Sequence, residues 1–246
     1  MIEYLTETGS TNSDFLRRLT GGDRLPEGNW LVADRQSEGR GRQGRDWFDG
    51  VGNFMGSTAV HRRASDPSAE TLALVAGLAL HEAVAWHGPG KTELLLKWPN
   101  DLMAGTAKVA GILLEAQGQA VVVGIGVNLV FAPDVPGRET AALAYLGTAP
   151  DRNLFAEDLA RGFATELERW RNAGLAPLLR RWSALAHPEG TQLTVHEPGG
   201  GPLNGEYAGL APDGSLRLRL ADGTLREIHA GEVLLAGHNQ DGTVKN

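Results

Sequence analysis

Runs of apolar residues divide the first half of the chain into several strands. Residues 29–34 and 120–128 each contain an uninterrupted apolar run, and the run in 120–128 is rich in β-branched side chains. Both runs predict buried strands. Further strands are predicted at 52–60, 93–98 and 108–115. The runs at 93–98, 108–115 and 120–128 are joined by short connections, which indicates an antiparallel meander.

Helices are predicted where apolar residues recur every three to four positions. A long apolar helix covers residues 68–86, and Asp66-Pro67-Ser68 provides its start signal. Others are predicted around 14–19, 152–172 and 175–185. His81 falls within the predicted helix at 68–86 and is interpreted as a packed or half-exposed residue and not as a ligand.

The pattern changes at residues 187–190, His-Pro-Glu-Gly. Beyond this point short alternating strands are separated by turn signals, which predicts a small barrel. The predicted strands are 192–196, 203–210, 215–220, 225–228 and 232–235. We therefore expect one domain over residues 1–188, a second over 189–237, and a frayed tail over 238–246.

Composition is that of an ordinary globular protein, with 246 residues, 41% hydrophobic and 22% charged. Cysteine is absent, which excludes disulfides, thiolate metal sites and a cysteine nucleophile. The first residues carry no basic and apolar leader pattern, and no apolar run approaches membrane-spanning length, so a cytoplasmic protein without membrane association is expected. The net charge of −7 argues against broad nucleic-acid binding, which depends on phosphate neutralisation.

The most unusual stretch is residues 33–47, Ala-Asp-Arg-Gln-Ser-Glu-Gly-Arg-Gly-Arg-Gln-Gly-Arg-Asp-Trp. Glycine permits a close backbone approach to a ligand, and arginine offers a planar fork of donors that suits phosphate and carboxylate. Concentrated positive charge on an acidic chain predicts a flexible anion-binding loop that orders on a ligand. The alternative is a solvated basic surface loop.

Part of this stretch matches the dinucleotide fingerprint G-x-G-x-x-G, at residues 39–44. That fingerprint requires a helix that opens within it. The residues that follow contain more glycine and no helical period, so a nucleotide fold of the Rossmann type is excluded.

Two further groups of polar residues border predicted elements. Ser10, Thr11 and Asn12 precede the first helix, where one capping residue would suffice, so they serve either as a cap alone or also as contacts to a polar ligand. Lys97 and Lys108 lie at the ends of predicted strands that we expect to be neighbours, with Asn100 and Asp101 between them. These lysines bind an anion or simply protect a sheet edge.

Five motifs in order carry a resemblance to a known family. They are Gly-Ser-Thr-Asn at 9–12, Gln36 with Gly-Arg-Gly-Arg-Gln-Gly-Arg at 39–45, Lys-Trp-Pro-Asn-Asp at 97–101, Lys-Val-Ala-Gly-Ile-Leu-Leu-Glu at 108–115 and Gly-Ile-Gly-Val-Asn at 124–128. Over nearly its whole length the chain resembles the biotin–protein ligases, or biotin–[acetyl-CoA-carboxylase] ligases. The resemblance implies an α+β fold. It consists of a mixed, mainly antiparallel sheet with helices on one side, as in class II synthetases, followed by an SH3-like barrel.

The resemblance also implies a two-step reaction. Biotin and ATP form biotinyl-5′-AMP with release of pyrophosphate, and biotin then passes to a lysine of a biotin carboxyl carrier protein, a subunit of acetyl-CoA carboxylase or of another biotin-dependent carboxylase. No enzyme nucleophile is needed, so catalysis consists of positioning and charge stabilisation by fixed cations. Mg²⁺ is the implied cofactor beside ATP, and the protein is expected to be a monomer or a homodimer.

Site residues are carried over by position. Lys108 and Arg42 are implied as catalytic, and Gly111, Ile112 and Leu113 as a wall of the pocket. Biotin contacts are implied for Ser10, Thr11, Asn12, Gln36, Arg40, Gly41, Arg42 and Lys108. Contacts to ATP or the adenylate are implied for Arg45, Trp47, Lys97, Asn100, Asp101 and Asn128, with Asp101 also as a ligand of Mg²⁺.

The chain departs from the family pattern at two places. Gln43 stands where many members have a basic residue. Some members also carry an N-terminal helix-turn-helix, and the first motif begins here at residue 9, so no DNA binding is expected. Two alternatives remain: a lipoate or octanoate ligase of related fold, and a regulatory protein that binds biotin or a nucleotide without turnover.

Overall fold

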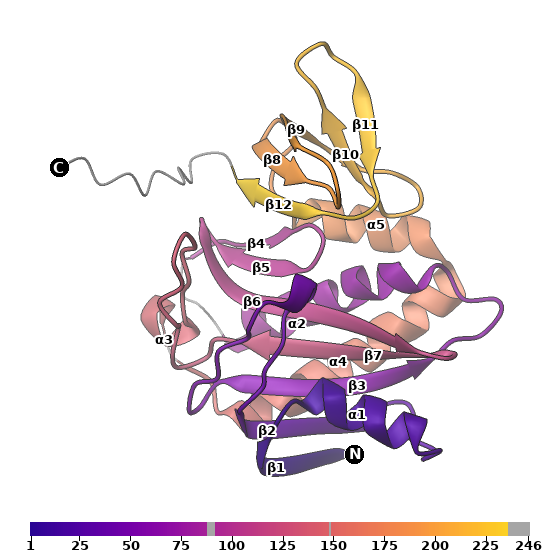
Figure 1. Ribbon diagram of the computed structural model, residues 1–246, viewed down its shortest axis with the longest axis vertical. Coiled ribbons are helices and arrows are strands. Elements are labelled where there is room, and N and C mark those ends of the chain that lie inside the picture. Colours follow the sequence, from indigo (N-terminus) through magenta and orange to yellow (C-terminus); the bar gives the residue numbers. More distant parts are fainter. Residues whose placement is uncertain (88–91, 148, 236–246) are drawn as a thin grey trace.

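Two β-sheets form the framework of the protein in a computed structural model that describes residues 1–87, 92–147 and 149–235 (Figure 1). The larger sheet has seven strands in the order β1-β2-β3-β7-β6-β5-β4, and the smaller has five in the order β11-β10-β9-β8-β12. The strands of the larger sheet are β1 Ile2–Thr8, β2 Trp30–Gln36, β3 Phe54–His61, β4 Leu94–Lys97, β5 Asp101–Ala104, β6 Ala107–Gln117 and β7 Ala120–Val127.

The larger sheet is mixed and mainly antiparallel, as predicted. β1 and β2 pair in parallel, whereas every other pair of neighbours in this sheet is antiparallel. The predicted meander is present but contains an additional strand, β5, at residues where only a connection was predicted. β4 and β6 are therefore not neighbours, and Asp101 at the start of β5 lies between Lys97 and Lys108. The N-terminal strand β1 was also not predicted.

The long helices share one face of this sheet, as predicted, but the short first helix does not. α2 Leu72–His87, preceded by the short helix η2 Ala69–Thr71, packs between the sheet and α4 Arg152–Ala173 (Figure 1). On the opposite face, α1 Thr11–Thr20 inserts Phe15 between Leu31, Ala59 and Val122. Since side chains alternate along a strand, the apolar residues of β2 and β3 serve both layers.

Almost every position of α2 is apolar, and its packing explains why. Ala69–His87 is long and apolar enough to cross a membrane by length and composition, but 67% of that apolar window is buried within the fold. A helix covered on two sides needs no polar face. His81 on this helix is half-buried, and burial lowers its pKa, while its Nε2 lies 3.1 Å from the carbonyl of Leu94. It is a packed helix residue, as interpreted from the sequence.

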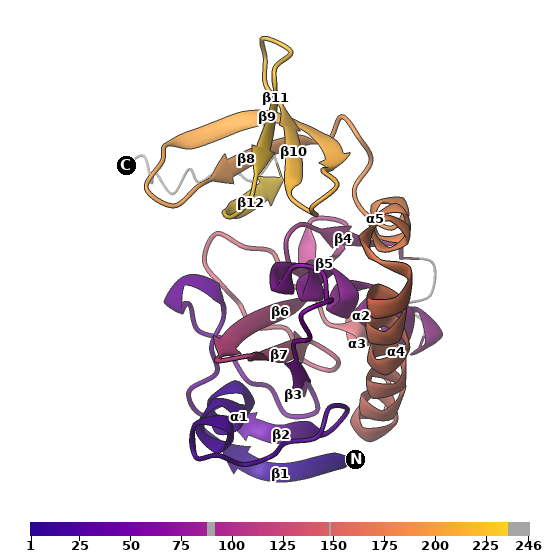
Figure 2. The same ribbon diagram turned by 90° about the vertical axis from the view of Figure 1, so that its right-hand side faces the viewer.

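In the described part of the chain the second sheet follows three helices, and it curls above the first sheet (Figure 2). Its strands lie where short alternating runs predicted them, and its buried residues continue the main apolar core. The elements of this half are α3 Leu143–Leu146, α4, α5 Leu175–Ala184, β8 Gln192–His196, β9 Pro202–Leu210, β10 Leu216–Arg219, β11 Leu225–Ile228 and β12 Glu232–Leu235. The division at residues 188 and 189 stays a prediction, and the predicted tail at 238–246 lies outside the described residues.

Candidate functional site

A cleft of about 970 Å³ lies beside α1, between the larger sheet and β12. The arginine- and glycine-rich stretch, here called the arginine loop (residues 39–47), lines it together with the loop between β7 and α3. Every residue to which the sequence assigned a role lies on this cleft, although the residues come from separate motifs. They are Ser10, Thr11, Asn12, Gln36, Arg40, Gly41, Arg42, Arg45, Trp47, Lys97, Asn100, Asp101, Lys108, Gly111, Ile112, Leu113 and Asn128.

The start of α1 forms a neutral polar end of the cleft. Ser10 is the cap, since its side chain accepts a bond from the amide of Ser13. Thr11 instead turns inward: its amide donates to Gln36 Oε1 at 2.8 Å, and its hydroxyl lies 2.7 Å from Ser57 Oγ. Ser57 donates to Asn12 Oδ1 at 2.5 Å. The run of polar residues is thus more than a helix cap.

This network continues to a carboxylate and then to the arginine loop. Asn12 donates from Nδ2 to Glu115 Oε2 at 2.8 Å, and Arg40 approaches Glu115 Oε1 at 3.1 Å. Ser10, Thr11, Asn12 and Ser57 are all buried, with at most 4% of each residue exposed. A buried chain of linked polar groups is rigid, because each group would lose its partner if it moved.

Glycines on the cleft floor make room for these side chains. A Cβ added at Gly124 would lie 2.2 Å from Asn12 Oδ1, and one at Gly126 would lie 2.3 Å from Trp47 Cε2. Both glycines are on β7, two residues apart, and therefore face the same side of the sheet. The Gly-Ile-Gly pattern thus allows α1 and Trp47 to lie directly on the strand.

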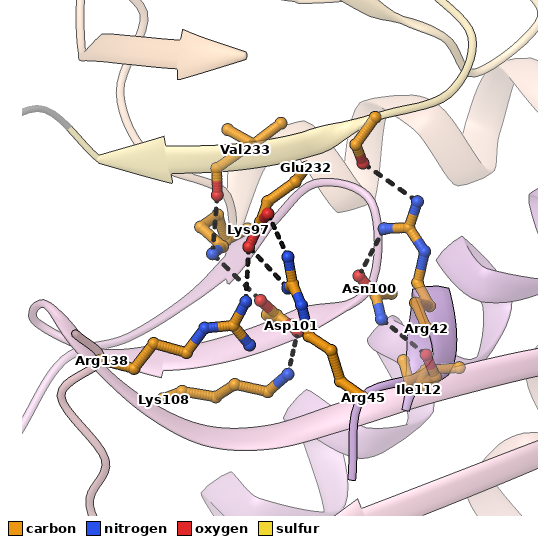
Figure 3. A network of polar contacts seen from close by, with 11 residues as sticks. Arg42, Arg45, Lys97, Asn100, Asp101, Lys108, Ile112, Arg138, Glu232 and Val233 are labelled. Atoms are coloured by element: carbon orange, nitrogen blue, oxygen red, sulfur yellow. Dashed lines mark hydrogen bonds and ion pairs between the residues drawn. The ribbon is translucent and has the colours of Figure 1, made fainter. Parts of the chain in front are cut away.

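An ion triad of three half-buried side chains lies further along the cleft (Figure 3). Asp101 Oδ2 is 3.0 Å from Lys97 Nζ, and Asp101 Oδ1 is 2.6 Å from Lys108 Nζ. Burial alone raises the pKa of Asp101, but the charges of Lys108 and Lys97 outweigh it and hold the pKa of that carboxyl well below its ordinary value of 3.8. The carboxylate therefore keeps both ammonium groups in place.

These contacts do not fit the prediction that Asp101 holds Mg²⁺. Both of its oxygens face ammonium groups, and a divalent cation there would be repelled by two positive charges. Among the described residues no group of three or more His, Cys, Asp or Glu side chains is placed to hold a metal ion.

Arg42 reaches across the cleft to both sheets. It donates to Asn100 Oδ1 at 3.1 Å and to the carbonyl of Gly231, before β12, at 3.0 Å. Asn100 in turn donates to the carbonyl of Ile112 at 2.6 Å. Burial lowers the pKa of Arg42 from its ordinary 12.5, yet the group stays charged at neutral pH. Its hydrogen bonds go to neutral acceptors, so its charge is available to an anion.

Two other arginines share one carboxylate of the second sheet (Figure 3). Arg45 forms a two-pronged pair with Glu232, with one contact at 2.6 Å, and Arg138 pairs with the same carboxylate. Arg138 lies in the loop between β7 and α3, and Glu232 is the first residue of β12. Sequence reasoning missed both, as it missed Ser57 and Glu115 as parts of the site. A polar Ser57 within an apolar strand was a usable signal, but nothing local marks Arg138 or Glu232.

Trp47 and Asn128 complete the cleft. Lys108 Nζ lies 5.8 Å from the centre of the Trp47 ring. Asn128 donates to the carbonyl of Ala141 at 3.2 Å. Within the described part of the chain, the buried Trp47 Nε1 and Asn128 Oδ1 have no hydrogen-bond partner. Because buried polar groups are nearly always paired, these two atoms are candidates to meet a ligand.

Comparison with known proteins agrees with this geometry. The family model described as "Biotin/lipoate A/B protein ligase family" matches residues 6–129, which is half of the chain. The chain belongs to this family. A second model, described as "Biotin protein ligase C terminal domain", matches residues 190–235. The resemblance inferred from the five motifs is confirmed.

Relatives within the biotin/lipoate ligase family match nearly the whole chain. A biotin–[acetyl-CoA-carboxylase] ligase of Paracoccus denitrificans is 36% identical over 244 residues, covering 95% of this chain and 100% of the relative. The corresponding ligase of Mycobacterium tuberculosis is 34% identical over 238 residues, covering 95% and 88%. The solved biotin protein ligase of Aquifex aeolicus, in complex with biotin and ATP, has a TM-score of 0.83 at 26% identity, with 95% and 97% covered.

Proposed function

We propose that this protein is an ATP-dependent biotin–protein ligase. It forms biotinyl-5′-AMP from biotin and ATP and then transfers biotin to a lysine of a carrier protein. One observation carries the proposal: a single cleft joins a buried, neutral hydrogen-bonding end to an end that gathers Arg42, Arg45, Lys97 and Lys108. Two anionic substrates that must react with each other need such a site. The names and ligands of the relatives support the same function.

The neutral end suits the biotin head group. Thr11, Asn12, Gln36 and Ser57 offer alternating donors and acceptors at fixed positions. A head group with amide-like N–H and C=O groups gains specificity from such a site, because the wrong ligand leaves buried polar groups unpaired. The apolar strand residues Ile112 and Leu113, on the cleft wall, suit the rest of the molecule.

The cationic end suits the reacting groups. A biotin carboxylate oxygen attacks the α-phosphorus of ATP, the bond to the pyrophosphate oxygen breaks, and pyrophosphate leaves. Both reactants are anions, so fixed cations must offset their repulsion and the charge that develops in the transition state. We assign Lys108 to the carboxylate and α-phosphate and Arg42 to the adenylate, because both are charged and held by residues of the cleft. Magnesium enters with ATP as part of that substrate.

In the second step the neutral amine of the acceptor lysine attacks the carbonyl carbon of biotinyl-5′-AMP, AMP leaves with the bonding electron pair, and the amine nitrogen loses one proton to solvent as the amide forms. No protein nucleophile takes part. The acceptor proposed is the lysine of a biotin carboxyl carrier protein, as the names of the relatives suggest. We place the reaction in the cytoplasm and expect no nucleic-acid partner, given the net charge of −7. We expect the protein to act as a monomer or a homodimer.

The test is biotin-dependent exchange of labelled pyrophosphate into ATP, in the presence of Mg²⁺, with lipoate and octanoate in parallel. Exchange that requires biotin supports the proposal. Exchange with lipoate or octanoate in place of biotin would keep the chemistry but replace the substrate. Tight biotin binding with no exchange for any acid would contradict catalysis and support a regulatory binding protein.

A further inference from the structure

Glu115, on β6, completes the polar network of the neutral end from outside the cleft. It does not line the cleft, whereas Thr11, Asn12 and Gln36 do. Its Oε2 accepts from Asn12 Nδ2 at 2.8 Å, and Arg40 Nη2 lies 3.1 Å from Oε1 and 3.3 Å from Oε2. The carboxylate thus contacts one residue of the neutral end and one residue of the arginine loop.

Tethering the arginine loop does not account for this carboxylate. The side chain of Arg40 is 44% exposed and that of Glu115 is 24% exposed, and an ion pair of this exposure contributes little to stability. The contact with Asn12 is different, because Asn12 is buried. A glutamine side chain could also accept from Asn12, but it could equally donate to it, whereas a carboxylate only accepts.

This acceptor-only character fixes the direction of the hydrogen bonds that follow. Asn12 must turn its NH2 group to Glu115, so its Oδ1 faces Ser57, which donates to it at 2.5 Å. A hydroxyl has one proton, so at the 2.7 Å contact between Thr11 and Ser57 the proton comes from Thr11. The Thr11 hydroxyl can therefore only accept a hydrogen bond from a ligand.

Gln36 supplies the complementary group. Its Oε1 accepts from the amide of Thr11 at 2.8 Å, so its NH2 group is the end that remains for other partners. That nitrogen lies beside the arginine loop, 3.3 Å from the position of a Cβ added at Gly39. An acceptor at Thr11 next to a donor at Gln36 matches the adjoining N–H and C=O groups of a ureido ring.

We infer that Glu115 is a positioning residue that orders the protons of this network and so makes the Thr11 hydroxyl an acceptor for a ureido N–H. The inference rests on the proposed function, in which biotin is the acid. It adds to that function the group that decides, from outside the cleft, where the head-group site donates and where it accepts.

Glu115→Gln should reverse the order of the protons. Arg40 only donates, so it holds the amide oxygen of the substituted side chain, and the NH2 group of that side chain then faces Asn12. Asn12 turns over to accept, its own NH2 donates to Ser57, and Ser57 donates to Thr11. The Thr11 hydroxyl then has a proton to give to a ligand, and a ureido N–H at that position meets a donor.

The probes are biotin and two cyclic carbamates, in each of which an oxygen replaces one ureido N–H. Titration calorimetry without ATP gives the Kd of each. The unaltered protein should bind the carbamate that lacks the N–H at Thr11 about 10- to 100-fold more weakly than biotin, the usual effect of a lost buried hydrogen bond. In Glu115→Gln, biotin should bind about 10-fold more weakly and this carbamate more tightly than in the unaltered protein.

Two further variants separate this role from general stability. Glu206→Gln is the matched control, because Glu206 accepts from Gln192 at 3.0 Å on the second sheet without lining the cleft, and it should change none of the Kd values. Ser57→Ala removes the relay between Asn12 and Thr11 and should by itself reduce the preference for biotin. Adding Glu115→Gln to Ser57→Ala should then change that preference less than about twofold, because the route is already broken.

Several results would overturn the inference. An equal loss of affinity for biotin and for both carbamates in Glu115→Gln would mark a structural role, and an unchanged preference would mean that Glu115 orders nothing. A full effect of Glu115→Gln in the Ser57→Ala background would show that it does not act through Ser57. If Glu115→Gln does not fold, an unchanged preference in Ser57→Ala contradicts the inference alone. If the unaltered protein does not bind biotin, the proposed function fails first.

Discussion

The two ends of the cleft are built in opposite ways. The neutral end is made from the first turn of α1 and from strands of the larger sheet, and its hydrogen-bonding side chains are buried except for the half-buried Gln36. The cationic end is made largely from two loops and the edge of a second sheet, and several of its charges are partly exposed. Regular structure gives the neutral end fixed geometry, whereas the loops give the cationic end partners that an anion can replace.

This contrast shows how one cleft can recognise a neutral group at one end and an anionic group at the other. A neutral head group is distinguished by the exact pairing of polar groups, which requires rigidity. A polyphosphate is recognised mainly through charge, which tolerates movement and depends on how many cations converge. Variants at the two ends should therefore affect different kinetic constants. Four predictions follow from this difference, ordered by the size of the expected effect.

The largest effect is expected from the cationic end. Lys108→Ala should lower the rate of biotin-dependent pyrophosphate exchange by about 100- to 1000-fold, the usual cost of a lost group that stabilises transition-state charge. The far-ultraviolet circular dichroism spectrum should be unchanged, because Lys108 is partly exposed and β6 is held by two neighbours. Near-normal exchange in this variant would rule out its assigned role.

The second effect concerns stability. Asp101→Asn leaves Lys97 and Lys108 without their shared carboxylate and should lower the free energy of unfolding at pH 7 by about 2–3 kcal/mol, less than for a fully buried pair because all three side chains keep some exposure. The pKa of Asp101 is lowered by folding, so its contribution is complete above its ordinary value of 3.8 and is lost as pH falls towards the lower folded value. Urea unfolding should show a gap between variant and parent that is constant above pH ~5 and narrows below pH ~4.

The exposed Asp23 provides the control for this measurement. Asp23→Asn should change the free energy of unfolding by no more than about 0.5 kcal/mol. A gap for Asp101→Asn that stays constant down to pH 2 would show that the lost stability comes from packing and not from the charge of Asp101.

A smaller and more selective effect is expected at the neutral end. Thr11→Val keeps the shape of the side chain but removes the hydroxyl that contacts Gln36 and Ser57. The KM for biotin should rise about 10-fold, because buried partners are left unpaired, while the KM for ATP changes less than about twofold. Equal increases in both constants would mean that the two ends are not independent.

The smallest effect is expected from salt. Raising NaCl from 50 to 300 mM should increase the KM for ATP about two- to fivefold, because partly exposed charges are screened over a Debye length of about 6–14 Å in that range. The KM for biotin should change less, since the side chains proposed to contact its head group are neutral and mostly buried. A larger change for biotin than for ATP would reverse the assignment of the two ends.

The parts of the fold that the sequence predicted are those marked by local patterns. Apolar runs located β6 and β7, and short alternating runs with Asp-Gly turns located the strands of the second sheet. The four-residue strand β5 was missed because it begins at a turn signal, Asn100-Asp101, and contains too few residues for a period to appear. The position of α1 on the opposite face was also not predicted, since a periodic stripe does not say which face it covers.

The residues of the site also fall into those marked by a local motif and those that are not. Residues within motifs, such as Arg42 and Lys108, were predicted to converge, and all of them line one cleft. Glu232 contacts Arg45, which lies 187 positions earlier in the sequence, and Arg138, which lies 94 positions earlier. Contacts of that range depend on how two sheets pack, which the local composition of a loop or a strand edge does not encode.

The location of β12 has a consequence for how the protein becomes active during synthesis. Gly231, Glu232 and Val233 supply the contacts that hold Arg42, Arg45, Arg138 and Lys97, and they are among the last described residues to leave the ribosome. The larger sheet and its helices can collapse earlier, since domains generally fold from the N-terminus onwards. The contacts of the three arginines to this edge then form last, so a nascent chain that already binds biotin would not yet hold Arg42, Arg45 and Arg138 in place for ATP.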